Sequence, residues 1–294
     1  MTSSALREAA HGPSPSARRI EFFSPNPSKR AVERYWLWYT PVWGALAGGV
    51  MLSGWAEEWG DGPLLAQGVL LALGAVLGPH WFCAPEDRGR PLRELSSVKL
   101  SLSVVGFAFL MNYFCTPFFF DVLHMHYGFQ TQLNIQNVPL FLYFMTVAYF
   151  ATYAALVMIG YRVVRSALAG RSRWLVGLGA ALVPFVVAGF ETAMNANPFM
   201  SRLFCYDDMG FMMWFGTLCY GTCFVFCLPV WMSIDELPGR VTAYTQLAVG
   251  VLAAMMMIVI SFELYRHLLA PHFTTVIPGA NGLRDVATSC LEAL

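Results

Sequence analysis

Long apolar segments, separated by short polar connections, dominate the pattern of hydrophobic and polar positions along the chain. A helix needs about 20 mostly apolar residues to cross the roughly 30 Å hydrocarbon layer of a bilayer. Seven segments meet or nearly meet this requirement, at residues 36–55, 63–84, 98–120, 138–161, 174–195, 209–233 and 241–262. The pattern therefore predicts an all-α fold, a polytopic membrane helix bundle of about seven transmembrane helices.

The polar segments outside these spans predict how the chain is organised. Residues 1–25 are rich in Ser, Pro, Ala and Arg and contain no apolar stretch suited to a cleaved signal peptide. We interpret them as a flexible polar leader, followed by a transmembrane helical domain over residues 26–275. Residues 276–294 are left as a short tail.

Composition narrows the class of protein further. Hydrophobic residues make up 57% of the chain and charged residues 12%, about half the roughly 25% charged residues of soluble domains. Disordered chains are poor in apolar residues, so disorder is excluded over most of the length. The 18 Lys and Arg residues balance 18 Asp and Glu residues, which leaves no basic excess for binding nucleic acid.

The basic residues are divided unevenly between alternate connections. All of the 18 Lys and Arg residues except Arg202, Arg266 and Arg284 precede the first span or follow an even-numbered span. Because Lys and Arg accumulate on the cytoplasmic side of membranes, we predict a cytoplasmic N-terminus, an odd number of spans and a C-terminus on the other side. The membrane is the inner membrane if the source is bacterial, or the endoplasmic reticulum if it is eukaryotic.

Glu191 is the clearest ionisable side chain inside a predicted span. It is the only charged residue between Arg173 and Arg202, and Asn195 lies one helical turn further along the same face. A charged side chain within a span costs a few kcal/mol on insertion scales, which makes it a candidate functional residue. The alternative is that Glu191 lies at the membrane interface and reaches water.

Other acidic residues stand at the ends of spans on the same side. Asp207 and Asp208 open the sixth span, where carboxylates favour the N-terminal helix dipole, and Glu263 ends the last span close to Arg266. In the predicted orientation these residues share the non-cytoplasmic depth with several other polar side chains, which are Asn112, Tyr113, Asp121, His124, His126, Glu191 and Asn195. Polar groups from four spans at one depth indicate a pocket.

The histidines and cysteines do not predict a metal site. His124 and His126 are two residues apart, a spacing that brings both side chains to one face only in an extended segment. Cys219, Cys223 and Cys227 recur every four residues, as expected of small side chains that pack between helices. We expect no disulfide framework among the seven cysteines.

Aromatic residues are dense at the depth of the predicted pocket, in residues 112–120 and 141–150. Most of these rings are expected to pack between helices. Ring faces also line flat apolar cavities and stabilise cations, so the remainder suit a rigid lipid such as a sterol.

Several short motifs occur in a fixed order along the chain. They are Asn26-Pro27-Ser28-Lys29-Arg30, Tyr39-Thr40-Pro41-Val42-Trp43, Asn112-Tyr113-Phe114, Tyr127-Gly128-Phe129, Asn137-Val138-Pro139, Glu191-Thr192, Cys205-Tyr206-Asp207, Asp235-Glu236 and the end of the last span from Glu263 to Arg266. In order and spacing these motifs resemble the cycloeucalenol cycloisomerase family, over about residues 26–271. The chain departs from the plant pattern at Pro117, near Leu140 and at Val147, where plant members carry histidine, and at Glu263, where they carry aspartate.

The resemblance implies a cofactor-independent isomerisation. The family opens the 9β,19-cyclopropane ring of a 4α-methyl sterol, converting cycloeucalenol to obtusifoliol through a carbocation, with no redox change. No nucleotide or metal cofactor is then required, in agreement with the absence of a dinucleotide or phosphate-loop glycine motif in the sequence. The implied partners are the sterol substrate and the lipid bilayer, and other sterol-pathway enzymes are possible partners.

A cyclopropane is a weak base, so its proton donor must stay protonated near neutral pH. Burial disfavours the charged form of a carboxyl group, and Glu191 fits this requirement best. We predict Glu191 as the general acid, with Asp207 or Glu263 as the base or proton relay. The residues predicted to bind or orient the substrate are Asn112, Tyr113, Phe114, Asn195 and Trp214.

Two other functions remain open from the sequence. A different sterol-modifying enzyme, such as a double-bond isomerase, would use the same combination of acid and aromatic residues. A seven-span transporter or lipid receptor without catalysis would use Glu191 to bind a proton or ligand, although no internal repeat typical of transporters is visible.

Overall fold

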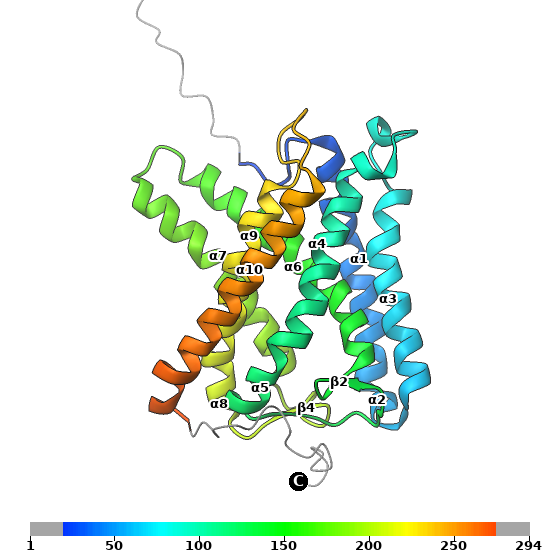
Figure 1. Cartoon of the computed structure of the whole chain (residues 1–294), viewed down its shortest axis with the longest axis vertical. Helices are drawn as coiled ribbons and strands as arrows, with labels where there is room; N and C mark the ends of the chain where they lie inside the picture. Colours follow the sequence, from blue (N-terminus) through cyan, green and yellow to red (C-terminus); the bar gives the residue numbers. More distant parts are fainter. Residues whose placement is uncertain (1–19, 275–294) are drawn as a thin grey trace, which may run out of the picture.

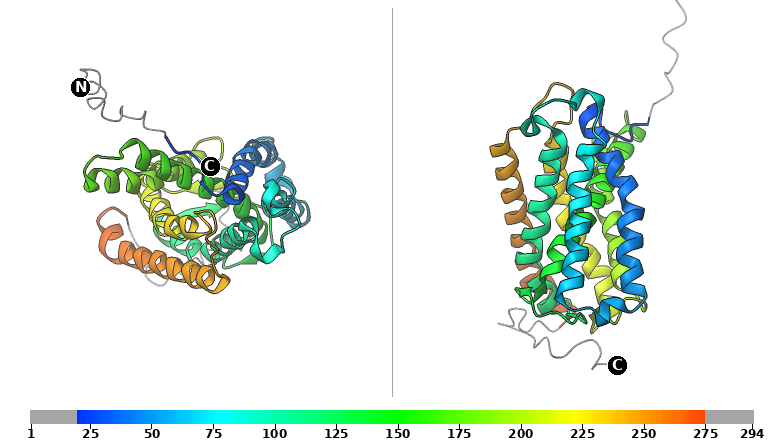
Figure 2. Two further views of the ribbon diagram at one scale, coloured as in Figure 1. Left: turned by 90° about the horizontal axis from the view of Figure 1, so that it is seen from above. Right: turned by 90° about the vertical axis from the view of Figure 1, so that its right-hand side faces the viewer.

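The long helices of this protein run roughly side by side in a bundle (Figures 1 and 2). The structure is a computed structural model that describes residues 20–274. The seven long helices are α1 (Pro27–Leu52), α3 (Asp61–Trp81), α4 (Ser96–Phe114), α6 (Leu140–Ala167), α7 (Arg173–Asn195), α9 (Thr217–Ser233) and α10 (Tyr244–Leu264). Each corresponds to one predicted apolar segment, which confirms the all-α fold.

Short helical segments extend or connect the long ones. α5 (Thr116–Val122) continues α4, and α8 (Met209–Phe211) and η4 (Met212–Gly216) lead into α9. The others are α2 (Trp55–Glu58), η2 (Pro85–Asp87), η3 (Leu92–Glu94), η5 (Tyr265–Leu269) and η6 (Ala270–His272). The third and sixth predicted spans are therefore each built from more than one helical segment, and the helix of the seventh continues past its predicted end through η5 and η6.

Six single helices or continuous runs of helical segments are long and apolar enough to cross a membrane. They begin at Asp61, Ser96, Leu140, Arg173, Met209 and Tyr244. The seventh long helix, α1, is not among them, because Tyr, Trp and Thr side chains dilute its apolar character. The six spans indicate a multi-pass membrane protein, one span fewer by composition than the sequence predicted.

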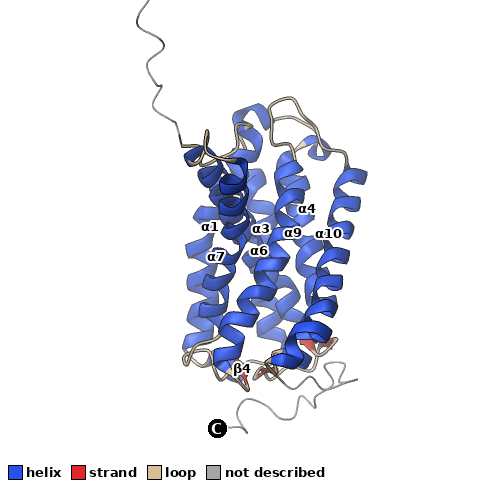
Figure 3. Cartoon of the chain, turned by 90° about the vertical axis from the view of Figure 1, so that its left-hand side faces the viewer, coloured by secondary structure: helices blue, strands red, loops and turns tan. Residues whose placement is uncertain are grey.

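The central helix of the bundle is α6. It packs against α1, α3, α4, α7 and α9, and most of its side chains are buried. α7 and α10 lie at the outside of the bundle (Figure 3). Both helices leave many large apolar side chains exposed. Such faces suit contact with lipid.

The two ends of the bundle differ in charge. We call the end formed by residues 20–30, 82–95, 168–172 and 234–243 the basic end, and the opposite end, formed by residues 53–60, 115–139, 196–211 and 265–274, the strand end (Figure 1). Every described Lys and Arg except Arg202 and Arg266 lies at or near the basic end. Residues 20–25, predicted as the last part of the leader, lie there as well.

Two small antiparallel sheets close the strand end. β1 (Met125–Tyr127) pairs with β4 (Phe204–Tyr206), with His126 opposite Cys205. β2 (Asn134–Ile135) pairs with β3 (Val138–Pro139) through a turn at Gln136 and Asn137. Both turn residues have positive φ, 54° and 60°, the conformation that two-residue hairpin turns of type I′ require.

Candidate functional site

A buried cavity of about 90 Å³ lies inside the bundle toward the strand end. Residues of α4, α5, α6, α7, α9, β1 and β4 line it. The lining residues are Met111, Asn112, Cys115, Thr116, Phe119, Met125, Tyr127, Leu142, Thr146, Tyr149, Phe150, Tyr153, Glu191, Asn195, Phe204, Tyr206, Tyr220, Cys223 and Phe224. The cavity is therefore mostly aromatic, with a few polar groups.

Glu191 is the one carboxyl group among the described residues that line this cavity. It lies in the last turns of α7 and is 8% exposed. Asn195, one turn later, donates a hydrogen bond from Nδ2 to Glu191 Oε1 at 2.8 Å. Lys, Arg and His of the described chain make no ion pair with Glu191, so its carboxyl group lies in apolar surroundings with an amide neighbour.

Asn112 approaches the cavity from α4. Its side chain is buried and donates from Nδ2 to the carbonyl oxygen of Ala108 at 2.8 Å. The sequence placed Asn112, Glu191 and Asn195 at one depth, and in the structure all three line the cavity.

Tyrosines supply much of the remaining polar surface. Tyr127, Tyr149, Tyr206 and Tyr220 all line the cavity, and Tyr149 donates its hydroxyl to Met145 Sδ at 2.9 Å. Burial raises the pKa of Tyr127 and of Tyr206 above the ordinary value, because the apolar surroundings disfavour the phenolate. The hydroxyls of Tyr127 and Tyr206 therefore stay protonated near neutral pH.

Asp207 does not line the cavity. Its side chain is 49% exposed and lies between two histidines: His124 Nδ1 is 3.1 Å from Oδ2, and His126 Nε2 is 3.1 Å from Oδ1. His126 lies in β1, and His124 directly precedes the strand with a left-handed backbone at φ 50°. The next residue, Asp208, caps α8 by accepting a hydrogen bond from Phe211 N at 2.8 Å.

Glu263 lies on the surface of α10, away from the cavity lining. It is 52% exposed and contacts Arg266 Nε at 3.7 Å and His267 Nε2 at 3.5 Å. Arg266 also pairs with buried Asp121, Nη1 to Oδ2 at 3.1 Å. The three predicted catalytic carboxylates are therefore not brought together, since Glu191 alone faces the cavity.

Three predicted substrate-binding residues also lie outside the cavity lining. Tyr113 and Phe114 point outward from α4 and are largely exposed, with their rings 4.8 Å apart. Trp214 is half exposed and packs against Phe273 at 4.8 Å between ring centroids. These side chains share the depth of the cavity but occupy other faces of their helices.

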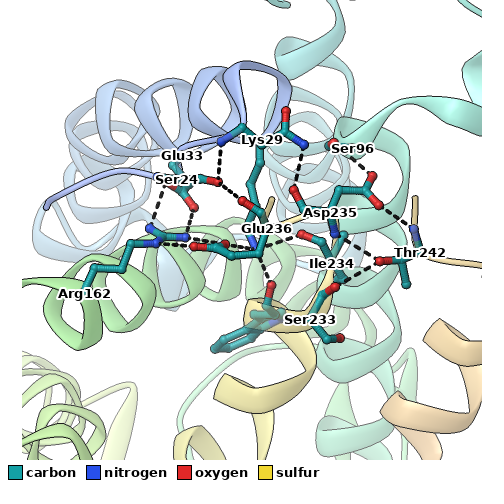
Figure 4. Close-up of polar contacts among 12 residues, drawn as sticks. Ser24, Lys29, Glu33, Ser96, Arg162, Ser233, Ile234, Asp235, Glu236 and Thr242 are labelled. Atoms are coloured by element: carbon teal, nitrogen blue, oxygen red, sulfur yellow. Dashed lines mark hydrogen bonds and ion pairs between the residues drawn. The ribbon is translucent and has the colours of Figure 1, made fainter. Parts of the chain in front are cut away.

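The sequence did not single out the cluster of charged residues at the basic end (Figure 4). We call Lys29, Glu33, Lys99, Arg162, Asp235 and Glu236 the charge cluster. Arg162 joins Glu33, Nη2 to Oε1 at 2.7 Å, and Glu236, Nε to Oε1 at 2.7 Å. Lys29 Nζ lies 2.8 Å from Glu236 Oε2.

The second half of the charge cluster is centred on Asp235, whose backbone has the left-handed conformation, with φ 43°. Lys99 Nζ lies 2.8 Å from Asp235 Oδ2, and Thr242 N donates to Oδ1 at 2.7 Å. The cluster ties α1, α4 and α6 to the segment after α9. Three cations and three carboxylates balance within it, which is how buried charges are tolerated.

The first described residues also join the charge cluster. Ser24 N donates to Glu33 Oε2 at 2.9 Å, and Asn26 Nδ2 donates to the carbonyl oxygen of Asp235 at 2.7 Å. Ser24, which belongs to the segment predicted as the flexible leader, is thus hydrogen-bonded to the charge cluster. Residues 1–19 of that leader and the predicted tail over residues 276–294 lie outside the described residues.

The cysteines differ from the expectation in one respect. Cys219, Cys223 and Cys227 are free and buried, as predicted for packing residues. Cys205, in β4, is disulfide-bonded, a single bond that the sequence, which predicted no disulfide framework, did not single out. Its sequence neighbourhood carries no spacing signal, because a disulfide joins residues that only the fold brings together.

Fold and site together define a class: an all-helical, multi-pass membrane protein with a buried aromatic cavity that holds a carboxyl group. The chain is similar to cycloeucalenol cycloisomerase of Arabidopsis thaliana, with 28% identity over 261 residues that cover 85% of this chain and 90% of the relative. This is the similarity of a distant relative, and that relative is named as an isomerase. No family model matches the chain, and no solved structure matches it.

Proposed function

We propose that this protein is a cofactor-independent sterol isomerase. Its reaction would open the 9β,19-cyclopropane ring of a 4-methyl sterol, of the type that converts cycloeucalenol to obtusifoliol. The observation that carries the proposal is the position of Glu191, a buried carboxyl group without a cationic partner among the described residues, in a cavity lined by aromatic rings. The similarity to cycloeucalenol cycloisomerase supports the choice of substrate.

In the proposed reaction Glu191 is the proton donor. The bond between C9 and C19 breaks as its electron pair takes the proton from Glu191, so that C19 becomes a methyl group and C9 a carbocation. Loss of the proton at C8 then forms the double bond between C8 and C9. The product is an isomer of the substrate, and no oxidant, reductant or metal takes part.

We further propose that Glu191 is the base as well. After the first step it is a carboxylate beside the cation, and taking the C8 proton restores the acid for the next turnover. Asp207 and Glu263 are both exposed and contact basic side chains outside the cavity, so the reaction is assigned without them. Asn195 holds Oε1 of Glu191 through its amide, and the tyrosine and phenylalanine rings stabilise the cation.

The volume of the cavity bears on how a sterol binds. About 90 Å³ is room for several water molecules, whereas pockets for whole small molecules measure roughly 300–1,000 Å³. Sterol binding therefore requires side chains or helices around the cavity to move apart. The proposal places the sterol within the bilayer portion of the inner membrane or endoplasmic reticulum, where other sterol-pathway enzymes would be its neighbours.

An isotope experiment tests the proposed function. Membranes that contain the protein are incubated in heavy water with a 9β,19-cyclopropyl, 4-methyl sterol, and the extracted sterols are analysed by mass spectrometry and NMR. We expect a ring-opened product with a double bond at C8 and deuterium in the C19 methyl group. Recovery of only unchanged cyclopropyl sterols, with each of several side-chain and C4 variants as substrate, would overturn the proposal.

A further inference from the structure

A second hollow lies far from the cavity, on the outer surface at the basic end. It is a groove of about 940 Å³ between α1 and the segment that follows α3, residues 82–86. Its lining includes two arginines, Arg30 and Arg34, and an aromatic row that continues along α1 with Tyr35, Trp38 and Tyr39. None of these side chains takes part in the proposed reaction.

The floor of the groove is fixed in place by contacts between α1 and α3. The hydroxyl of Tyr35 donates to the carbonyl oxygen of Gly74, and that of Tyr39 to the carbonyl oxygen of Leu71, both at 2.9 Å. A Cβ atom at Gly74 or Gly78 would overlap these two tyrosines, so glycine at both positions lets the rings lie against α3. The groove is therefore built into the helix pair.

The walls change character along the groove. Tyr35 stacks on Tyr39 at 5.7 Å and on Phe82 at 5.4 Å between ring centroids, and the groove continues to Val42. From Arg30 to Val42 the helix rises about 18 Å at roughly 1.5 Å per residue. One end of this apolar strip therefore lies beside two positive charges, and the other end lies deeper in the predicted membrane span.

The two arginines contact a backbone carbonyl oxygen and an aromatic ring, and these contacts leave their positive charges uncompensated. Arg30 donates from Nη2 to the carbonyl oxygen of Pro25 at 3.1 Å, and the Arg34 guanidinium lies 5.1 Å from the centroid of the Phe23 ring. A guanidinium carries five donors, so most remain for a ligand. Glu86 is the carboxylate in the lining, and the two arginines outweigh its charge.

We propose that this groove binds one anionic phospholipid. The phosphate and the charged head group would lie against Arg30 and Arg34, and an acyl chain would lie along the strip from Tyr35 to Val42. Arginine binds phosphate oxygens through its planar donor fork, and anionic lipids accumulate in the cytoplasmic leaflet, toward which the basic end is predicted to face. The occupant must match both the positive and the aromatic part of the groove, as an amphiphile does.

The test measures lipid binding directly and does not depend on catalysis. The full chain is purified in detergent, stripped of lipid and mixed with equal amounts of phosphatidylglycerol and phosphatidylcholine, and bound lipids are counted by native mass spectrometry. We expect the wild type to retain one molecule of phosphatidylglycerol. The double variant Arg30→Gln/Arg34→Gln is expected to lose it, because its affinity for phosphatidylglycerol should be at least tenfold lower. The matched control is Arg90→Gln/Arg93→Gln, which removes the same charge at the same end outside the groove.

A second measurement locates the bound lipid in proteins that keep both Arg30 and Arg34. Phosphatidylglycerol with brominated acyl chains is expected to quench tryptophan fluorescence in the wild type, and less in Trp38→Phe, whose ring lines the groove. Equal retention by the two double variants, equal binding of phosphatidylcholine, or quenching that Trp38→Phe leaves unchanged would each overturn the proposal.

Discussion

Glu191 differs from the other acidic side chains of the strand end in its surroundings. Asp121 pairs with Arg266, and Asp207 lies between two histidines. Glu263 contacts Arg266 as well, while Asp208 caps a helix. A proton donor must carry its proton when the substrate binds, and a neighbouring cation opposes this by favouring the charged form of a carboxyl group. Glu191 has no cationic partner among the described residues, and it lines the cavity.

Replacing Glu191 by glutamine keeps the size of the side chain and removes its exchangeable proton. We expect the rate of ring opening by Glu191→Gln to fall by about 10²–10⁴-fold, the usual contribution of a general acid or base, with unchanged expression and folding. Asp207→Asn and Glu263→Gln serve as matched controls and are expected to stay within a few-fold of wild type. Sterol product formation in membranes measures all three rates. Full activity of Glu191→Gln would contradict the assignment, and loss of activity in either control would return that residue to the reaction.

The residues of the cavity were predictable only in part from the sequence. Glu191 and its neighbour Asn195 stand out because a charged residue inside a long apolar run is a rare event that needs no knowledge of the fold. Tyr206 and Tyr220 carry no such signal, since aromatic residues are common along the whole chain. The sequence predicted that Asp207 and Glu263 lie at the same end of the bundle as Glu191, and they do. It could not predict which way each side chain faces around its helix or loop, and this direction decides whether the side chain reaches the cavity.

At the scale of elements, the spans were predicted well because length and apolar composition are dictated by the bilayer. The interruptions were not. The third span breaks at Cys115 between α4 and α5, and the sixth begins with α8 and η4 before α9. The charge cluster was also missed, because its residues stand at helix ends and in connections, where the sequence alone predicts solvated charges.

The charge cluster predicts how acid affects the packing of α1 against α6. Burial would raise the pKa of Glu236, but the hydrogen bond and charge of Arg162 and those of Lys29 outweigh it and lower the pKa below its ordinary value. A carboxylate whose folded pKa is lowered contributes stability that is complete above its unfolded pKa, near 4.5, and is lost as pH falls through the folded value. The facing charges are Lys29, Glu33 and Arg162.

We therefore expect Glu236→Gln to lower the free energy of unfolding near pH 7 by about 3 kcal/mol, as when one partner of a buried ion pair is removed. The variant should also lose less of its remaining stability than the wild type does between pH 5 and pH 3. Thermal midpoints of the protein in detergent, followed by fluorescence-detected size exclusion, measure both effects. Glu94→Gln, whose partner Arg90 is 3.7 Å away and exposed, is the control. If Glu236→Gln lost as much stability on acidification as the wild type, Glu236 would not be the source of the acid sensitivity.

At the scale of the whole molecule, a net charge of +0 conceals a strong separation. The described basic residues other than Arg202 and Arg266 gather at one end, and the cavity with its carboxyl group lies toward the other. The disulfide-bonded Cys205 lies at the strand end, whereas Cys83 near the basic end is free. Disulfides persist on the oxidising side of a membrane, so two independent features favour the same orientation.

This orientation is testable with single cysteines introduced at each end. Arg171 at the basic end and Gln130 at the strand end are both exposed, and each is replaced by cysteine in a Cys83→Ser background. A membrane-impermeant maleimide added to sealed vesicles with the cytoplasmic face outward should label Arg171→Cys at once, and Gln130→Cys only after detergent is added. The reverse pattern would place the N-terminus on the non-cytoplasmic side. Arg30 and Arg34 lie at the same end of the bundle as Arg171. With the reverse pattern they would face the non-cytoplasmic leaflet, and not the anionic lipids of the cytoplasmic one.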